Sequence, residues 1–332
     1  MDLITECVSG VGNQFAAQTR NGLTLGSIYA MIALGYTLVY GVLQLINFAH
    51  SEVFMVSTFA ALYALGTLFG VSEPQAGLAL VLIVLGTLVI CAATSGGVAV
   101  LLERLAYRPL RRRGAPRLSY LISAIGASLF LQYLFVLMDG QHYLLFFKLP
   151  AIAGAAPRPV PEVMATQTAF TAFGSVITNK RILVVLVALA MLLILDRFVN
   201  RTHFGRGIRA VSQDAEAAAM MGVDIDRVIV VTFLVGGVMA GAAGLLYIIV
   251  LGAPAFWFIG FIPGIKAFTA AVLGGIGNIR GAMLGGLLLG LVEAYSVPCL
   301  GTQWTSVTAF VVLVIVLMFR PTGLLGESVS RD

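Results

Sequence analysis

The sequence predicts an all-α fold: a polytopic membrane helix bundle of about 8–9 transmembrane helices. Hydrophobic residues make up 59% of the 332 residues and charged residues only 11%, whereas a soluble domain carries about 25% charged residues. The charges are also clustered, which leaves long uncharged stretches at 23–51, 53–72, 74–102, 118–138, 228–265 and 294–319. About 20 apolar residues are enough for a helix to cross a bilayer. Because strand-like alternation is absent, we expect helices rather than a barrel.

The uncharged stretches divide into about nine candidate spans. They cover residues 22–42, 47–70, 76–101, 118–138, 181–199, 228–250, 264–277, 282–297 and 304–320. The segment 264–277 is short for a full crossing and can instead be re-entrant, which would change the count. We expect one transmembrane domain over residues 1–332.

Its three cysteines (Cys7, Cys91 and Cys299) are expected to be small packing residues.

The orientation of the spans follows from the positions of Lys and Arg. Residues 103–117 carry six arginines against one acid, and residues 196–227 carry five arginines. The positive-inside rule therefore places both loops in the cytoplasm, and the proline-containing loop 139–180 between them outside. The same count puts the C-terminus inside and the N-terminus outside. The net charge of +5 has its source in these basic loops, so it does not indicate a nucleic-acid partner.

The cytoplasmic segment 205–227 predicts a short amphipathic helix. Ser212 or Asp214 can cap its N-terminus, and Asp214 and Glu216 lie where the helix dipole favours acids. Gly222 fits the left-handed position that ends a helix. A passive interfacial helix is the alternative, but such a helix usually carries bulky apolar anchors, whereas this one offers mainly Ala and Met. We therefore expect it to dock into a cleft of another protein.

Long segments of the chain resemble the branched-chain amino-acid ABC transporter permeases, in particular the LivH-type subunit. The resemblance is carried by RNGLTLGSIYAMIALGYTLVYGVLQLINFAHSEVFM from Arg20, ERLAYRPLRRRGAPRLSYLISAIGASLFLQ at 103–132, KAFTAAVLGGIGNIRGAMLGGLLLGLVEA at 266–294 and RPTGLLG at 320–326. The segment 205–227 resembles the EAA coupling loop of bacterial ABC-importer permeases. The chain departs from the family pattern at Ser51, where Gly is usual, and at Val223, where Ile is usual. Ser51 is expected to alter local helix packing or the shape of the pathway.

The resemblance implies a permease subunit of an ATP-driven importer in the bacterial cytoplasmic (inner) membrane, moving branched-chain amino acids by alternating access. It would pair with a second homologous permease, two cytoplasmic ATPase subunits that hold ATP and Mg, and an external substrate-binding protein. The chain has no GxxxxGK[ST] phosphate-binding motif, so we expect no catalytic residue, cofactor or metal in it. The residues implied to couple to the ATPase are Arg209, Asp214, Glu216, Ala217 and Gly222.

Polar residues inside the membrane are costly to bury and are therefore candidates for function. The candidates for lining or gating the pathway are Asn47, His50, Glu52, Lys266 and Glu293. Asn47 and His50 are one helical turn apart, so we expect them to share a helix face. The alternative roles are structural: Glu52 or Glu293 pairs with Lys266, or each caps a broken helix. If Asn47 and His50 lie at a membrane face, they mark a helix entry rather than a binding site.

The sequence leaves the cargo and the energy source open. Sister families of the same permease architecture carry urea and short amides, so these are the alternative cargo. An ion-coupled secondary transporter is the remoter alternative, because only the resemblance argues for ATP. An ion channel is disfavoured, since no charged ring or carbonyl filter is visible. A membrane enzyme is disfavoured because the sequence has no HExxH motif, and because His50 and Glu52 would face different sides of a helix.

Overall fold

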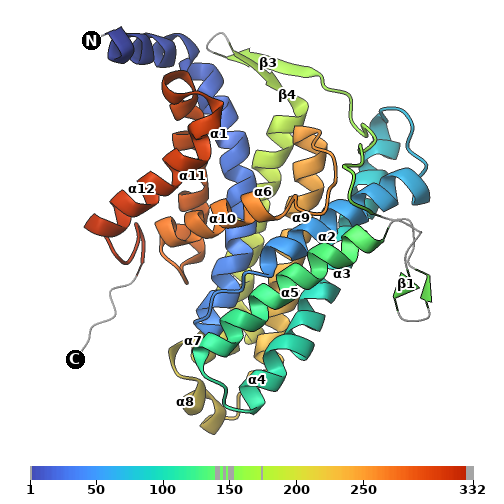
Figure 1. Cartoon of the computed structure of the whole chain (residues 1–332), viewed down its shortest axis with the longest axis vertical. Helices are drawn as coiled ribbons and strands as arrows, with labels where there is room; N and C mark the ends of the chain where they lie inside the picture. Colours follow the sequence, from blue (N-terminus) through green and yellow to red (C-terminus); the bar gives the residue numbers. More distant parts are fainter. Residues whose placement is uncertain (1, 139–142, 145–146, 149–152, 173–174, 327–332) are drawn as a thin grey trace. The chain divides into compact units, whose positions relative to one another are not determined.

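The computed structural model describes residues 2–138, 143–144, 147–148, 153–172 and 175–326. It confirms the all-α membrane fold: within these ranges, eight helices are long and apolar enough to cross a bilayer (Figure 1). The segment predicted at 264–277 differs from the others. It forms helix α10 (Phe261–Gly274) of 14 residues, which is shorter than a full span of about 20 residues.

Long helices make up most of the rest of the chain. In chain order they are α1 (Asp2–Leu43), α2 (His50–Tyr63), α3 (Gly77–Leu102), α4 (Arg108–Arg112), α5 (Arg117–Leu137), α6 (Asn179–Arg201), α7 (His203–Gln213), α8 (Ala215–Met220), α9 (Ile225–Leu251), α11 (Ile279–Leu300) and α12 (Thr305–Phe319), of which α4, α7 and α8 are short. Two π-helical segments, η1 (Ala64–Leu68) and η2 (Glu103–Tyr107), extend α2 and α3, and a 3-10 turn, η3 (Thr302–Trp304), precedes α12. Antiparallel strand pairs are formed by β1 (Tyr143–Leu144) with β2 (Phe147–Lys148), and by β3 (Thr168–Ala172) with β4 (Ser175–Thr178).

Both strand pairs lie in the segment that the sequence predicts as the external loop 139–180. Within that loop, residues 139–142, 145–146, 149–152 and 173–174 lie outside the described residues. Helix α6 begins at Asn179, two residues before the predicted start of the span. The paired strands β3 and β4 are consistent with a loop that has backbone pairing of its own rather than a bare linker.

Besides the start of α1 at Asp2 rather than at residue 22, two features differ from the prediction based on charge. The span predicted to end at residue 101 continues as helix through η2 and α4 to Arg112, so most of the predicted loop 103–117 is helical. Arg, Leu, Glu and Ala are all good helix formers, so the charges mark where the helix leaves the apolar region without ending it. The helix ends instead where Gly114 adopts φ 60° and Pro116 precedes α5. The second difference is α7, which was not predicted from the sequence.

The chain folds into two compact units. Unit 1 comprises residues 1–37, 166–196 and 265–332, and unit 2 comprises residues 38–165 and 197–264. Helices α1, α6 and α10 contribute residues to both units.

Unit 2 is built around α2, α3, α5 and α9, which pack side by side (Figure 1). Helices α3 and α9 approach closely because Gly237 and Gly241 on α9 have no side chain. A Cβ at either position would lie only 2.7 Å from a backbone oxygen of α3, that of Ser95 or of Cys91. Ser57 on α2 donates a hydrogen bond to the carbonyl of Gly241 at 2.5 Å. Such close backbone contact stabilises helix pairs in lipid, where the hydrophobic drive between helices is weak.

Unit 1 holds the close contact between α1 and α11. A Cβ at Gly290 would overlap the backbone of Gly26, so neither position tolerates a side chain without movement of a helix. The turn between α10 and α11 contains Gly277 at φ 94°, a conformation that favours glycine. Asn278 then caps α11 by accepting a hydrogen bond from the backbone N–H of Gly281 at 3.0 Å.

The cysteines do not all behave as expected. Cys91 on α3 is a free, buried thiol, as a packing residue should be. Cys299, near the end of α11, is disulfide-bonded, so the expected packing role is wrong for this residue. Spacing along the chain does not reveal which residues the fold brings together. The side chain of Cys7 lies outside the described residues.

Candidate functional site

Helix α8 has the N-cap that the sequence predicts. Asp214 Oδ1 accepts hydrogen bonds from the backbone N–H groups of Glu216 at 2.9 Å and of Ala217 at 3.0 Å. These are two of the donors that a helix N-terminus leaves without a partner. After the last turn, Gly222 has φ 83°, the left-handed conformation that ends helices. Both ends of this short helix are therefore fixed.

Helix α7 precedes α8 directly and positions it. The sequence pattern did not predict α7. Thr202 Oγ1 caps α7 by accepting a hydrogen bond from the backbone N–H of Gly205 at 3.0 Å. Arg209, which the resemblance implies couples to the ATPase, donates to the carbonyl of Val199 and to Asn200 Oδ1 at 3.3 Å. It therefore braces the corner between α6 and α7. A Thr that precedes a helix is an N-cap signal, and it is the feature of the sequence that could have revealed α7.

The outer face of α8 is open and mixed in chemistry. Glu216 is exposed, Ala217 is half-buried, and Ala218 is buried against the protein. Met220 and Met221 are 82% and 85% exposed. Met is flexible and apolar, so it adapts to the surface of a partner. We name Glu216, Met220 and Met221 the α8 surface. An acidic side chain beside two exposed apolar side chains is typical of an interaction site.

Glu52 on α2 is the centre of a hydrogen-bonded cluster in unit 2. Its Oε1 accepts from Ser51 Oγ at 3.1 Å, Ser128 Oγ at 3.1 Å and Gln132 Nε2 at 2.8 Å. The side chain is fully buried, and Oε2 has no hydrogen-bond partner in the part of the chain that the structure describes. The orientation of Glu52 is therefore set by neutral donors on α2 and α5. Ser51, one of the two departures from the family pattern, supplies one of them.

Glu293 is the acid that pairs with Lys266, and both lie in unit 1. Lys266 Nζ on α10 lies 2.9 Å from Oε1 and 3.1 Å from Oε2 of Glu293 on α11. Tyr29 on α1 donates to Glu293 Oε2 at 3.0 Å, and its ring centroid lies 5.7 Å from Lys266 Nζ. All three side chains are buried. One ionic cluster thus joins α1 to two consecutive helices, α10 and α11, near the other end of the chain.

Asn47 and His50 do not share a helix face. Helix α2 begins at His50, and Asn47 lies in the turn before it, after Gln44 at φ 51°. The expected shared helix face does not form, because α2 begins only at His50. Asn47 Oδ1 accepts a hydrogen bond from the Tyr107 hydroxyl at 2.8 Å, and His50 is buried. The two residues thus mark the entry to a helix.

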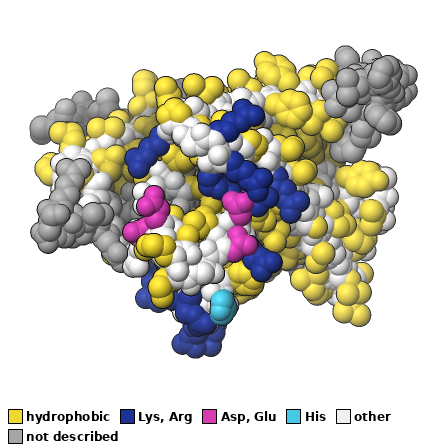
Figure 2. Space-filling model, turned by 90° about the horizontal axis from the view of Figure 1, so that it is seen from below, with side chains coloured by type: hydrophobic (Ala, Val, Ile, Leu, Met, Phe, Trp, Pro, Cys, Tyr) yellow, Lys and Arg dark blue, Asp and Glu magenta, His cyan; other side chains and the backbone are white. Residues whose placement is uncertain are grey.

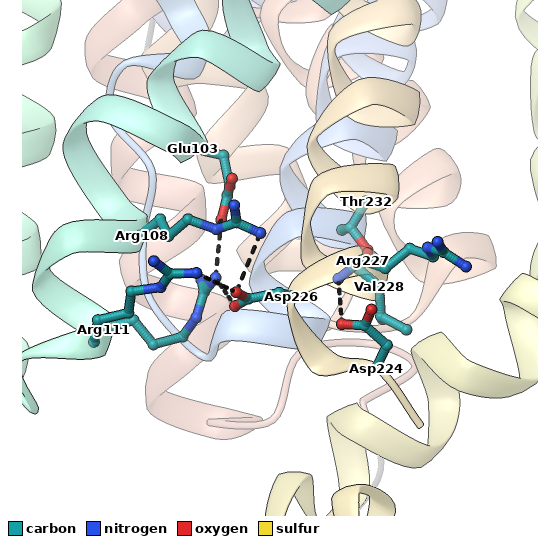
Figure 3. A network of polar contacts seen from close by, with 9 residues as sticks. Glu103, Arg108, Arg111, Asp224, Asp226, Arg227, Val228 and Thr232 are labelled. Atoms are coloured by element: carbon teal, nitrogen blue, oxygen red, sulfur yellow. Dashed lines mark hydrogen bonds and ion pairs between the residues drawn. The ribbon is translucent and has the colours of Figure 1, made fainter. Parts of the chain in front are cut away.

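A further ionic cluster in unit 2 was not identified from the sequence (Figure 3). Arg111 Nη2 lies 2.9 Å from Glu103 Oε1 and also contacts Asp226 Oδ1. Arg108 Nη2 and Arg112 Nη2 lie 3.1 Å and 3.4 Å from Asp226 Oδ2. We name Glu103, Arg108, Arg111 and Asp226 the arginine clasp. The sequence shows one acid at the end of the span that forms α3 and one at the start of the span that forms α9. It does not show that these two helix ends lie side by side.

Basic side chains gather on the face of the molecule that Figure 2 shows, with a few acids among them. In unit 2, Arg104, Arg113 and Arg117 are exposed around the clasp segment, whereas Arg108 and Arg111 are half-buried. The exposed arginines agree with a basic helix end at the surface of a membrane. The half-buried ones lie within ion-pair distance of both Glu103 and Asp226, whereas the exposed Arg112 contacts only Asp226.

Comparisons with known proteins agree over nearly the whole chain. Residues 18–317 match the family described as "Branched-chain amino acid transport system / permease component". The high-affinity branched-chain amino acid transport system permease protein LivH of Salmonella typhimurium is 40% identical, over 94% of this chain and 96% of its own. The corresponding protein BraD of Pseudomonas aeruginosa is 39% identical over the same shares. The autoinducer 2 import system permease protein LsrC of Yersinia enterocolitica is 33% identical over 46% of this chain and 41% of its own. The chain is therefore an integral membrane protein and belongs to the branched-chain amino acid transport system permease family.

Proposed function

We propose that this chain is the permease subunit of an ATP-driven importer that moves Leu, Ile and Val across the cytoplasmic membrane by alternating access. The match to the family over residues 18–317 carries the proposal. The α8 surface supports its coupling part, because a helix fixed at both ends offers an acid and two exposed Met to a partner. The permease would form a single domain over residues 1–332.

ATP hydrolysis is assigned to partner chains. The sequence has no GxxxxGK[ST] motif, so ATP and Mg²⁺ would be held by two cytoplasmic ATPase subunits. A second, homologous permease would complete the pathway, and an external binding protein would deliver the cargo. When the ATPase pair closes on ATP, α8 would move with it, and the membrane helices attached to α8 would change their tilt.

Glu52 is the intramembrane residue that we place at a gate of the pathway. Its Oε2 is buried without a partner among the described residues, so it is free to accept a hydrogen bond from a moving group. Lys266 and Glu293 form an ion pair, with Nζ 2.9 Å from Oε1, which fits a structural role that holds unit 1 together. The remaining candidates, Asn47 and His50, lie at a helix entry, where they would set the path of the chain.

We place the N-terminus outside the membrane. Arg20 donates to the carbonyl of Val176, and Arg181 donates to Asn21 Oδ1 at 2.9 Å, so the membrane part of α1 starts beside the start of α6. The start of α6 follows the loop that the charge pattern puts outside. The disulfide at Cys299 near the end of α11 agrees, because disulfides persist in oxidising compartments.

We place the C-terminus and the basic helix ends in the cytoplasm. Asp196, near the end of α6, pairs with Arg280 at the start of α11, with Nε 3.1 Å from Oδ1. The C-terminal segment joins the same turn, since the backbone N–H of Leu325 donates to the carbonyl of Gly274 at 3.0 Å. The end of α6 leads into the basic segment 196–227, so all these parts would lie on one side, and α10 would return the chain to it.

This topology predicts the side from which cysteines are labelled. Arg113→Cys should react with an impermeant maleimide only after the cytoplasmic side is opened, whereas Thr171→Cys in β3 should react in intact cells. Both positions are exposed, while Cys91 is buried and Cys299 is in a disulfide, so neither of these two native cysteines should add to the signal. Labelling of Arg113→Cys in intact cells would overturn the orientation.

The cargo is tested by competition. Proteoliposomes that contain this chain with its second permease, ATPases and binding protein should take up labelled leucine, and excess valine but not urea should reduce the uptake. A branched aliphatic side chain and an amide differ in hydrophobicity, so one site does not serve both equally. The partial match to a permease of an autoinducer 2 import system makes this test necessary. Uptake of urea without leucine would move the chain to the alternative cargo.

A further inference from the structure

We propose that the arginine clasp is the element that transmits movement from α8 to the membrane helices α3 and α9, with Arg111 and Asp226 as its positioning residues. This inference rests on the proposed function and names how its coupling site acts. It requires three connections within unit 2: a stiff path from α8 to Asp226, a tight bond from Asp226 to α3, and helices that move as one body beyond that bond.

The path from α8 to the clasp is short, and hydrogen bonds fix both of its ends. After the last turn of α8, the backbone N–H of Gly222 donates to the carbonyl of Ala219 at 2.9 Å, and that of Val223 donates to the carbonyl of Ala218 at 3.0 Å. Asp224 then caps α9, because its Oδ1 accepts from the backbone N–H of Arg227 at 3.0 Å (Figure 3). Only residues 221–224 separate α8 from α9, and Asp226 lies in the first turn of α9. We therefore expect α8 and Asp226 to move together.

The bond from α9 to α3 is a bridge made by two guanidinium groups. Arg111 contacts Asp226 and lies 2.9 Å from Glu103 Oε1. Arg108 lies 3.1 Å from Asp226 Oδ2 and 3.9 Å from Glu103 Oε1. Arg111 therefore binds an acid at the end of α3 and an acid at the start of α9, whereas Arg108 binds Asp226 and lies only within ion-pair distance of Glu103 (Figure 3). Planar guanidinium groups suit such two-partner contacts because their donors have fixed directions.

Burial makes this bridge stronger than an ordinary surface pair. The side chain of Glu103 is 0% exposed and that of Arg111 is 21% exposed, so water competes little for their charges. Glu103 Oε2 has no partner among the described residues. That oxygen can accept a hydrogen bond from a guanidinium that Asp226 releases when it shifts. The clasp would then have a second arrangement, in which Glu103 binds the arginines through both oxygens. An element with two arrangements is what a coupling mechanism needs.

Beyond the clasp, α3 and α9 have the contacts of a rigid pair. The α9 glycines 237 and 241 meet the α3 backbone along one face, and interlocked backbones of this kind resist sliding. A displacement delivered at Asp226 would therefore tilt both helices rather than separate them. A clasp with a purely structural role would affect stability but would leave the efficiency of coupling unchanged.

The test measures leucine uptake and ATP hydrolysis together in proteoliposomes that contain the complete transporter. Asp226→Ala should retain the ATPases and hydrolyse ATP, but its leucine taken up per ATP should fall about tenfold, within the usual range of coupling energies. Asp226→Glu, which keeps the negative charge, should take up nearly as much leucine per ATP as the wild type. The matched control is Asp196→Ala, which breaks the exposed pair with Arg280 at the end of α6 and should leave the ratio unchanged.

A rescue variant separates transmission from stability. The double variant Arg111→Cys/Asp226→Cys should take up less leucine per ATP than the wild type. A short bis-maleimide that joins the two cysteines should restore most of the leucine taken up per ATP. An unchanged ratio in Asp226→Ala, or a lost ratio that the cross-link does not restore, would overturn the clasp while leaving the proposed function intact. Absence of leucine uptake in the wild type would overturn the proposed function and this inference together.

Discussion

Replacement of Glu216 by Arg is expected to abolish association with the ATPase subunits while the chain still inserts into the membrane. The residue is exposed on α8, and Asp214 rather than Glu216 supplies the cap, so the substitution leaves the fold in place. It reverses the one charge of the α8 surface, in the first turn of the helix. Like charges brought together across an interface cost several kcal/mol, which corresponds to a loss in affinity of about a hundredfold or more.

Association is measured by titration of purified ATPase onto the permease in nanodiscs. Glu73→Arg is the matched control, since Glu73 is also exposed but lies in the segment before α3 that the topology places outside. That variant should bind the ATPase as the wild type does. Normal binding by Glu216→Arg would show that α8 is not the docking helix, and the assignment of the α8 surface would have to be withdrawn.

Truncation of Glu293 to Ala is expected to have the largest effect on stability. It would leave Lys266 buried without its acid, and removing one partner of a buried ion pair costs about 3–5 kcal/mol. The loss should appear as a much lower unfolding temperature in detergent. The double variant Lys266→Met/Glu293→Leu removes both charges and should recover most of the stability, because apolar side chains of similar size often replace buried pairs at little cost.

Transport by the double variant then decides the role of the pair. If Lys266 and Glu293 only hold α10 against α11, the stable double variant should take up leucine at close to the wild-type rate. A stable double variant that has lost transport would instead place the pair in the pathway. A double variant as unstable as Glu293→Ala would mean that the cluster with Tyr29 is not replaceable by apolar packing.

The membrane spans could be predicted from the sequence because they depend on one property that is visible along the chain. Long stretches poor in charge located the long helices and, despite Lys266, the short segment that forms α10. The cap at Asp214 and the left-handed Gly222 were also predictable, because capping is decided within a few residues. The helical continuation to Arg112 cannot be predicted from charge, because charged residues such as Arg and Glu are good helix formers and do not end a helix.

The side-chain partners could not be predicted, because they depend on which helices lie side by side. Glu103 and Asp226 belong to spans that are far apart in the chain, and only the packing of α3 against α9 brings them to the same arginines. In the same way, the sequence left Glu52 and Glu293 as equal candidates to pair with Lys266. The fold settles that choice through the contact between α10 and α11, and gives Glu52 neutral donors from α5.

The central claim is that ATP hydrolysis by partner subunits drives cargo through this chain. It is tested most directly by leucine accumulation in proteoliposomes of the complete transporter, with ATP, with ADP, or with an imposed proton or sodium gradient and no nucleotide. We expect accumulation against a concentration gradient only with ATP, and its loss in Glu216→Arg. Accumulation driven by the ion gradient without ATP would contradict the account and identify the chain as part of an ion-coupled transporter.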